Sequence, residues 1–214
     1  MIEETPTTLR TPDGVTLEAR TAGGPASRGA VVLAHPHPLY GGDMDNPVVV
    51  RAAEVCAGLG LATLRFNFRG VGHSTGTHGQ GVAERVDVET ALDHFRGTPA
   101  AAAGLALIGY SFGALVAAHV TASRPGLTGL CLVAPPLARA ASTLPPALST
   151  FGGPFCIVAG TRDEYCLPAA VDVARGQFPR ARVALVEGAD HFFLGKLFPM
   201  GEEVATWARA VLAR

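Results

Sequence analysis

Short apolar runs of strand length alternate along this chain with segments of helical spacing, about six times in succession. The apolar runs are Ala30–Ala34, Leu61–Phe68, Leu105–Gly109, Leu127–Ala134, Pro154–Ala159 and Arg182–Val186. The segments with helical spacing are Pro47–Gly58, Gly81–Phe95, Phe112–Ser123, Pro168–Phe178 and Glu202–Ala213. Strands that are apolar on both faces and alternate with helices are typical of parallel sheets. The pattern therefore predicts an α/β fold with a mostly parallel central sheet and helices on both of its faces.

An antiparallel hairpin is predicted before the first of these runs. Thr7–Arg10 and Val15–Arg20 flank the turn-forming residues Thr11-Pro12-Asp13-Gly14, and such a turn between alternating apolar positions favours a hairpin. We expect it to form an antiparallel edge of the sheet. The chain of 214 residues is 48% apolar and 16% charged, enough to bury one core, so we expect a single domain over residues 1–214.

Charge and cysteine content exclude several classes of partner and site. The formal net charge of -1 gives no electrostatic reason to expect nucleic acid or an anionic membrane. The polar N-terminal stretch and the absence of a long apolar run predict a soluble, cytoplasmic protein. The edge strand of the predicted hairpin would allow a homodimer as well as a monomer. Cys56, Cys131, Cys156 and Cys166 have no C-x-x-C spacing, so we expect buried thiols rather than disulfides or a zinc site.

Polar residues gather where the predicted strands end, which is where parallel sheets place their ligand sites. The segments that follow the strands include His35–Gly42, Arg69–Gly72, Tyr110–Gly113, Gly160–Glu164 and Glu187–His191. A serine, acidic residues and histidines are therefore predicted to meet at one edge of the sheet.

The motif G-x-S-x-G occurs twice, around Ser74 and around Ser111. Its structural meaning is a sharp turn from strand to helix that exposes a serine hydroxyl above the sheet. Only Ser111 has an apolar run directly before it and a good helix former directly after it, whereas Ser74 is followed by a glycine-rich loop. We predict that Ser111 is a nucleophile, with the N–H of Phe112 as an oxyanion donor, and that Ser74 is a turn residue. The alternative for Ser111 is a helix N-cap.

A serine nucleophile needs a histidine base, and the chain has seven histidines. We select His191, because it follows the last strand at the correct edge. His35 and His37 share a proline-interrupted segment for which we expect another use. Histidines within predicted helices or in the glycine-rich loop are weaker candidates: His94, His119, His73 and His78.

The base in turn needs a carboxylate to hold its tautomer. Asp163 follows the strand Pro154–Ala159 and gives the chain order Ser, Asp, His. Glu164 is the near alternative, and Asp190 is too close to His191 in sequence to reach its ring easily. A solvated turn aspartate paired with Arg162 is the other interpretation of Asp163.

These residues resemble the α/β-hydrolase superfamily, and within it the small lidless hydrolases related to dienelactone hydrolase that carry an HPHP-type loop. The resemblance covers nearly the whole chain and rests on five segments: His35–Gly42 with Met44-Asp45-Asn46, Arg65–Gly72, Gly109–Gly113, Ala134–Pro136 and Gly188–Phe193. It implies that the first loop supplies the second oxyanion N–H. Since proline has no N–H, that donor is His37, Leu39 or Tyr40. The chain departs from dienelactone hydrolase in having serine where that enzyme has cysteine, and in the Glu164-Tyr165-Cys166 that follows the acid.

The segment in which lidded relatives insert helices is short here. Only Leu137–Gly153 separates the neighbouring strands, and it contains Pro145-Pro146, so no substantial lid is expected. We therefore predict an open, shallow site with an aromatic rim. The rim candidates are Tyr40, Tyr110, Phe112, Phe192 and Phe193, with ordinary edge packing as the alternative role.

Together these observations predict hydrolysis of small carboxylic esters through an acyl-enzyme, with a small-molecule acyl ester as the partner. A thioester, lactone or short peptide would suit the same triad, and a catalytically idle binding module is the alternative from another class. No metal or organic cofactor is expected, because the chemistry needs none.

Overall fold

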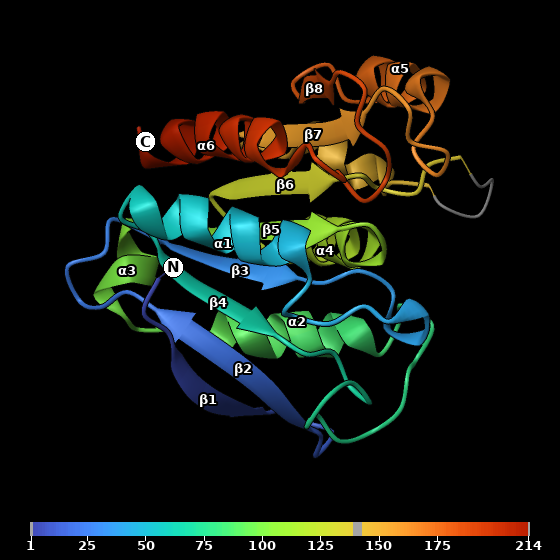
Figure 1. The fold of residues 1–214 in the computed structure, drawn as a ribbon. Coiled ribbons are helices and arrows are strands. Elements are labelled where there is room, and N and C mark those ends of the chain that lie inside the picture. Colours follow the sequence, from blue (N-terminus) through green and yellow to red (C-terminus); the bar gives the residue numbers. More distant parts are fainter. Residues whose placement is uncertain (1, 139–142, 214) are drawn as a thin grey trace.

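The alternating pattern forms one eight-stranded sheet in the computed structural model, which describes residues 2–138 and 143–213. The strands are β1 (Thr5–Arg10), β2 (Thr16–Ala22), β3 (Ala30–Ala34), β4 (Ala62–Phe66), β5 (Leu105–Tyr110), β6 (Gly129–Val133), β7 (Phe155–Gly160) and β8 (Arg182–Val186). Their order across the sheet is β1-β2-β4-β3-β5-β6-β7-β8 (Figure 1). The strands from β3 onward run parallel, and the β1–β2 hairpin pairs antiparallel with β4. The predicted sheet and its antiparallel edge are confirmed.

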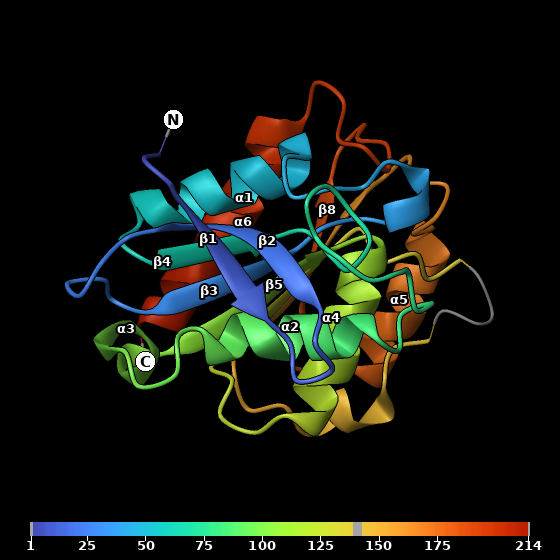
Figure 2. The ribbon, with the colours of Figure 1, turned by 90° about the horizontal axis from the view of Figure 1, so that it is seen from below.

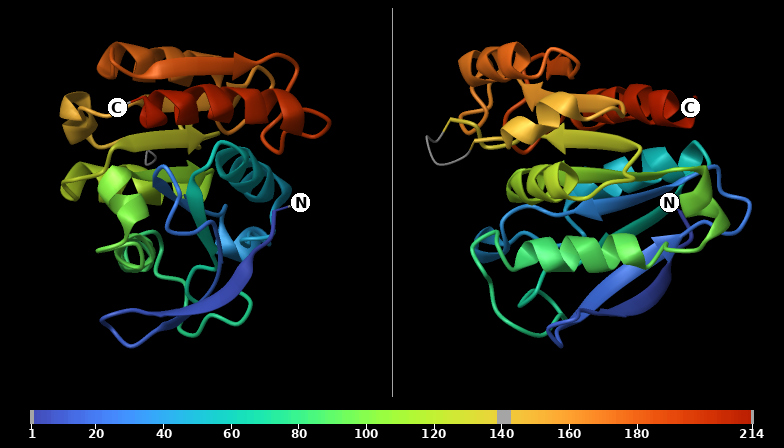
Figure 3. Two further views of the ribbon diagram at one scale, coloured as in Figure 1. Left: turned by 90° about the vertical axis from the view of Figure 1, so that its left-hand side faces the viewer. Right: turned by 180° about the vertical axis from the view of Figure 1, so that it is seen from behind.

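Helices cover both faces of the sheet, as predicted. They are α1 (Pro47–Gly58), α2 (Glu84–Asp93), α3 (Pro99–Ala103), α4 (Phe112–Ser123), α5 (Pro168–Gln177) and α6 (Leu197–Leu212), with 3-10 turns η1 (Pro38–Tyr40) and η2 (Pro146–Thr150). Helices α1 and α6 pack side by side on one face, and α2 and α4 cover the other (Figures 2 and 3). Each face buries its own apolar core, so the sheet is the shared wall of two hydrophobic layers.

Helix α6 begins at Leu197, earlier than the predicted start at Glu202. The prediction treated Gly201 as the residue before the helix, but Gly201 lies inside it. A Cβ on Gly201 would stand 2.8 Å from Nε of Arg51 and 3.3 Å from Val55 on α1. The glycine therefore marks the close contact of α6 with α1 rather than a helix boundary. The short helix α3 was not predicted.

Strand β4 ends at Phe66, before the predicted end at Phe68. The N–H of Asn67 still donates to Glu18 O on β2 at 2.8 Å. The N–H of Phe68 instead donates to Nε2 of His35 at 2.9 Å, so the strand ends there. The side chains alternate in this segment, so that Phe66 and Phe68 enter the core while Arg65 and Asn67 bind loops.

The segment between β6 and β7 carries no large insertion among the residues that the structure describes; residues 139–142 lie outside them. Leu144 and Leu148 are buried in the core beside α4, so this part of the segment packs against the domain. The four cysteines are unpaired and buried, as predicted, and burial raises the pKa of the Cys56 and Cys166 thiols to about 12.

Candidate active site

Ser111 lies in a strained turn between β5 and α4. Its backbone has φ 53° and ψ -117°, a conformation that non-glycine residues rarely adopt. The motif has glycine on both sides of Ser111 because neighbouring backbone lies too close to leave room for a Cβ atom. A Cβ on Gly109 would lie 2.3 Å from Gly113 O, and one on Gly113 would lie 2.4 Å from Ala34 O. The turn therefore has the geometry that G-x-S-x-G predicted.

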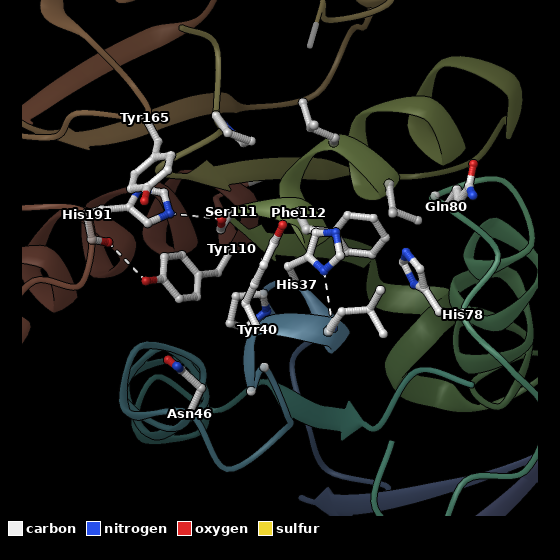
Figure 4. A pocket seen from close by; sticks show the side chains of 18 of the residues that line it. His37, Tyr40, Asn46, His78, Gln80, Tyr110, Ser111, Phe112, Tyr165 and His191 are labelled. Carbon is white, nitrogen blue, oxygen red and sulfur yellow. Dashed lines mark hydrogen bonds between the residues drawn. The ribbon is translucent and has the colours of Figure 1, made fainter. Parts of the chain in front are cut away.

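His191 bridges Ser111 and Asp163 through its two ring nitrogens. Nε2 lies 2.9 Å from Oγ of Ser111, and Nδ1 lies 3.0 and 2.9 Å from the two carboxylate oxygens of Asp163. An ionised carboxylate can only accept, so Nδ1 carries the proton and Nε2 is left to accept the serine proton. Figure 4 shows the serine and histidine side chains pointing toward each other. The structure thus brings together the three residues that the sequence singled out.

Asp163 is held by backbone groups of its own loop. It is 1% exposed, and its Oδ1 accepts the N–H groups of Tyr165 and Cys166 at 2.8 and 2.9 Å. The two competing carboxylates lie elsewhere. Glu164 is exposed, and Oδ1 of Asp190 accepts N–H groups in its own loop.

Ser74 and His35 bind backbone groups of the surrounding loops and do not line the cavity described below. The Ser74 hydroxyl donates to Asn67 O at 2.8 Å and accepts the N–H of Glu18, which stabilises the loop after β4. His35 is buried; its Nδ1 donates to Pro36 O at 2.7 Å and its Nε2 accepts the N–H of Phe68. Burial lowers the pKa of His35 to about 4, so the ring is neutral and ties the loop after β3 to the end of β4.

The segment Arg65–Gly72 supports that loop through polar side chains. Arg65 donates to Met44 O and pairs with Asp45 and Glu4. Asn67 accepts the N–H of Met44 at 2.8 Å. Within the described ranges, Arg65 and Asn67 form no hydrogen bond or ion pair with Ser111, Asp163 or His191. Their place in the resemblance reflects the support of the loop that carries the candidate oxyanion donors.

The candidate oxyanion donors belong to two segments, the start of α4 and the loop after β3. Phe112 begins α4, so no earlier helical carbonyl accepts its N–H. In the loop after β3, the N–H of Leu39 donates to Nδ1 of His37 at 3.2 Å and that of Tyr40 donates to His37 O at 3.1 Å. Both of these N–H groups are therefore engaged within the 3-10 turn η1.

A cavity of about 900 Å³ opens over Ser111, which is within the usual range of about 300–1,000 Å³ for small-molecule sites. This volume does not measure depth, so the shallow site stays a prediction. Figure 4 shows His191 and Tyr165 at one end of the cavity, His78 and Gln80 at the other, and Ser111, Phe112 and His37 between them.

The aromatic rim differs in part from the prediction. Tyr40 and Phe192 are 83% and 64% exposed at the cavity. Tyr110 also lines the cavity, but it is 3% exposed and its hydroxyl donates to His191 O at 2.9 Å. Phe193 is fully buried in the core beneath α6, so its predicted place on the rim is wrong. Its φ of 52° turns the chain between Phe192 and the following residues.

Sequence reasoning missed several residues that line the cavity. The ring of Tyr165 lies beside that of His191 in a tilted arrangement, with 4.7 Å between ring centroids. His78 and Gln80 come from the glycine-rich loop, Arg85 comes from α2, and His119 comes from α4. The signal available for His119 was its spacing of two i+4 steps from Ser111. Nothing comparable marks the others, because their approach depends on how α2 packs beside α4.

The described residues, 2–138 and 143–213, contain no group of three or more histidine, cysteine, aspartate or glutamate side chains that could hold a metal ion. None of their helices is long and apolar enough to cross a membrane.

Comparison with known proteins places these features in a family. An alpha/beta hydrolase domain model matches residues 27–209. An uncharacterised protein of Rickettsia prowazekii is 35% identical over 172 residues, which are 77% of this chain and 71% of that protein. The structure of an alpha-beta serine hydrolase homologue from Coxiella burnetii has a TM-score of 0.85 and 32% identity, covering 96% of this chain and 98% of that one. A serine hydrolase without a lid from Xanthomonas campestris has a TM-score of 0.83 and 27% identity, covering 97% of this chain and 94% of that one. This chain belongs to the alpha/beta hydrolase family.

Proposed function

We propose that this hydrolase is a serine esterase that cleaves small carboxylic esters through an acyl-enzyme. The observation that carries the proposal is the hydrogen-bonded series from Asp163 through His191 to Ser111, which ends at the floor of the cavity. The neutral tautomer assigned to His191 leaves Nε2 directed at the serine hydroxyl, as a general base requires.

In the acylation step, Oγ of Ser111 attacks the acyl carbon and its proton passes to Nε2 of His191. The carbonyl oxygen becomes an oxyanion and accepts hydrogen bonds from backbone N–H groups. The tetrahedral intermediate then collapses, the bond to the alcohol oxygen breaks, and His191 gives its proton to that oxygen. Asp163 stabilises the transient imidazolium without taking its proton.

Deacylation repeats these steps with water. His191 takes a proton from a water molecule as its oxygen attacks the acyl carbon, and returns the proton to Oγ of Ser111 when the ester bond to the serine breaks. The products are the carboxylic acid and the regenerated hydroxyl.

One oxyanion donor in this proposal is the N–H group of Phe112, and the second comes from the loop after β3, from His37, Leu39 or Tyr40. Phe112 follows the nucleophile at the start of α4, where the helix dipole also favours negative charge.

Small esters fit the cavity better than long lipid chains do. The described part of the segment between β6 and β7 packs against the domain beside α4, and the cavity has mixed polar and apolar walls. Thioesters, lactones and short peptides would react by the same steps, so the choice of an ester is the part of the proposal that a substrate panel must test.

Labelling with a fluorophosphonate, followed by intact-mass measurement, tests the proposal. Wild-type protein should gain one label and Ser111→Ala should gain none, and the variant should lose ester hydrolysis by at least about 10⁴-fold. Ser74→Ala is the matched control, because Ser74 has the same motif but lies in a supporting loop; it should still be labelled.

The same experiment separates the alternatives. Folded wild-type protein that takes no label and cleaves no ester would support an idle binding module. Label retained in Ser111→Ala and lost in Ser74→Ala would move the nucleophile to Ser74. Labelling at Ser111 with turnover of thioesters or lactones alone would keep the triad and overturn the ester assignment.

A further inference from the structure

The cavity is lined by one permanent cation and by no acidic side chain among the residues that the structure describes. Arg85 is that cation, and the remaining ionisable groups of its wall are imidazoles and tyrosine hydroxyls. A cavity lined by charges of one sign concentrates ligands of the opposite charge. The cavity is therefore suited to an anionic ligand.

Arg85 stands at the end of the cavity away from the catalytic histidine. Leu115 and His119 follow Ser111 along α4 and line the wall with Arg85. The rise of an α-helix places His119 about 12 Å along the helix from Ser111. Since α2 packs beside α4, Arg85 and His119 meet at this distal end.

The chemistry decides which half of an ester faces Arg85. His191 must reach the leaving oxygen to protonate it, so the alcohol half lies on the side of His191 and Tyr165. The acyl half then extends in the opposite direction, past Leu115 toward Arg85. The distal end is therefore the acyl end.

The guanidinium of Arg85 is positioned by the loop before α2. Its Nε donates to Gly81 O at 3.2 Å, and the carboxylate of the buried Glu84 accepts the N–H groups of Gly79 and Gly81 at 2.7 and 2.8 Å. Gln80 has a positive φ of 56° in this turn, which a non-glycine residue adopts only where its surroundings enforce it. The loop thus holds one edge of the guanidinium.

The outer nitrogens of Arg85 have no acidic partner within the described ranges, unlike those of Arg65 and Arg69, which are paired with carboxylates. A planar guanidinium presents two parallel N–H donors to a carboxylate. Burial, followed by the charge of Arg85, lowers the pKa of His119. The neutral His119 therefore adds a hydrogen-bonding group beside Arg85 without a second charge.

We propose that Arg85 binds a terminal carboxylate on the acyl half of the substrate, so that the preferred substrates are monoesters of dicarboxylic acids. This inference rests on the proposed esterase function and adds the substrate class. Leu115 and Val116 would contact the methylene groups between the two ends of the acyl chain, and Arg85 would set the preferred chain length.

The kinetic test compares matched acyl chains that differ only at the far end. The mono-p-nitrophenyl esters of adipic, suberic and sebacic acids are compared with p-nitrophenyl hexanoate, octanoate and decanoate. Wild-type protein should favour one carboxylate-terminated ester over its methyl-terminated partner in kcat/KM. Arg85→Gln should lower that preference by about 10- to 100-fold, as expected for loss of a charged hydrogen bond.

Two variants control for charge and for geometry. Arg175→Gln removes an exposed arginine on α5, away from the cavity lining, and should keep the wild-type preference. Arg85→Lys keeps the charge but not the planar fork, and should retain more of the preference than Arg85→Gln does.

A binding measurement tests, independently of turnover, whether Arg85 binds the carboxylate. Ser111→Ala is titrated with monoethyl suberate by calorimetry, and adding Arg85→Gln should raise Kd about tenfold or more. Turnover of both ester series with no preference, or a preference that survives Arg85→Gln, would overturn the carboxylate site and leave the esterase function standing. If no ester is cleaved and Ser111 takes no label, the proposed function fails. Arg85-dependent binding of monoethyl suberate would then still support the site, and its absence would overturn it.

Discussion

The hydroxyl of Tyr110 donates a hydrogen bond of 2.9 Å to the backbone carbonyl of His191. Tyr110 is the last residue of β5 and directly precedes Ser111, whereas His191 belongs to the loop after β8. The bond therefore connects the backbone of the candidate base to the residue beside the candidate nucleophile. It fixes the distance between two segments that are far apart in the sequence.

Tyr110→Phe should slow ester hydrolysis without unfolding the protein. The change leaves the buried His191 carbonyl without its donor, so we expect a loss of about 1 kcal/mol of stability and a fall of about threefold to tenfold in kcat, with a smaller effect on KM. Steady-state kinetics and urea unfolding measure both. Tyr40→Phe, which removes an exposed hydroxyl, should leave stability within about 0.5 kcal/mol. Equal stability losses in the two variants would contradict the positioning role.

Asp163→Asn should lower kcat for ester hydrolysis by about 10³- to 10⁴-fold. The carboxylate accepts two backbone N–H bonds as well as the Nδ1 proton of His191. The amide of asparagine has only one accepting oxygen, because its NH2 group donates. The histidine would then lose its productive tautomer. The effect is measured as the rate of ester hydrolysis and the rate of fluorophosphonate labelling. Glu164→Gln, at the exposed neighbour, should retain activity; the opposite result would make Glu164 the acid.

The stability of the fold should fall between about pH 6.5 and pH 4, in part through His35. Burial lowers the pKa of His35 from 6.5 to about 4, so over this range the unfolded chain binds the proton and the folded protein does not. The contribution is fully present above pH 6.5 and is lost as the pH falls, by up to about 3 kcal/mol. Urea unfolding at a series of pH values measures the slope.

The matched variants for this measurement are His35→Gln and His73→Gln. His35→Gln should be less stable than wild type at neutral pH, with a difference that narrows as the pH falls. His73 is exposed, so His73→Gln should change the stability at neutral pH by less than about 0.5 kcal/mol. A difference for His35→Gln that does not change with pH would show that other groups cause the slope.

Asp87→Ala should destabilise the loop after β4 and the fold with it. Asp87 is fully buried, and its carboxylate accepts bonds from both the side chain and the N–H of Arg69. Removing it leaves a largely buried guanidinium with Asp13 alone, at an expected cost of about 3 kcal/mol. Asp172→Ala removes an exposed ion pair with Arg175 and should cost less than about 1 kcal/mol in the same urea titration. Similar costs for the two variants would refute the prediction.

The arrangement of the triad could be predicted from sequence because each signal is local. A strand of apolar residues, two glycines around Ser111 and a helix former after it determine a sharp turn whatever the rest of the chain does. The parallel order of the strands then places Asp163 and His191 at the same edge. Neither inference needs knowledge of how the helices pack.

The roles of the aromatic residues were decided by tertiary structure. Phe192 and Phe193 are adjacent and chemically alike, but the positive φ at Phe193 and the packing beneath α6 direct one to the cavity and bury the other. The Tyr110 hydroxyl likewise has a partner on a distant loop. A sequence pattern specifies which residues are apolar and not which of two neighbours the backbone turns inward.

The sequence alone thus determined the α/β sheet, the strained turn at Ser111 and the order of the three residues at its edge, because these follow from local propensity and chain connectivity. Only the tertiary structure decided the wall of the cavity. Arg85 and His119 stand on different helices, and they meet there because α2 packs beside α4. That packing depends on long-range burial of apolar faces, which no short motif encodes.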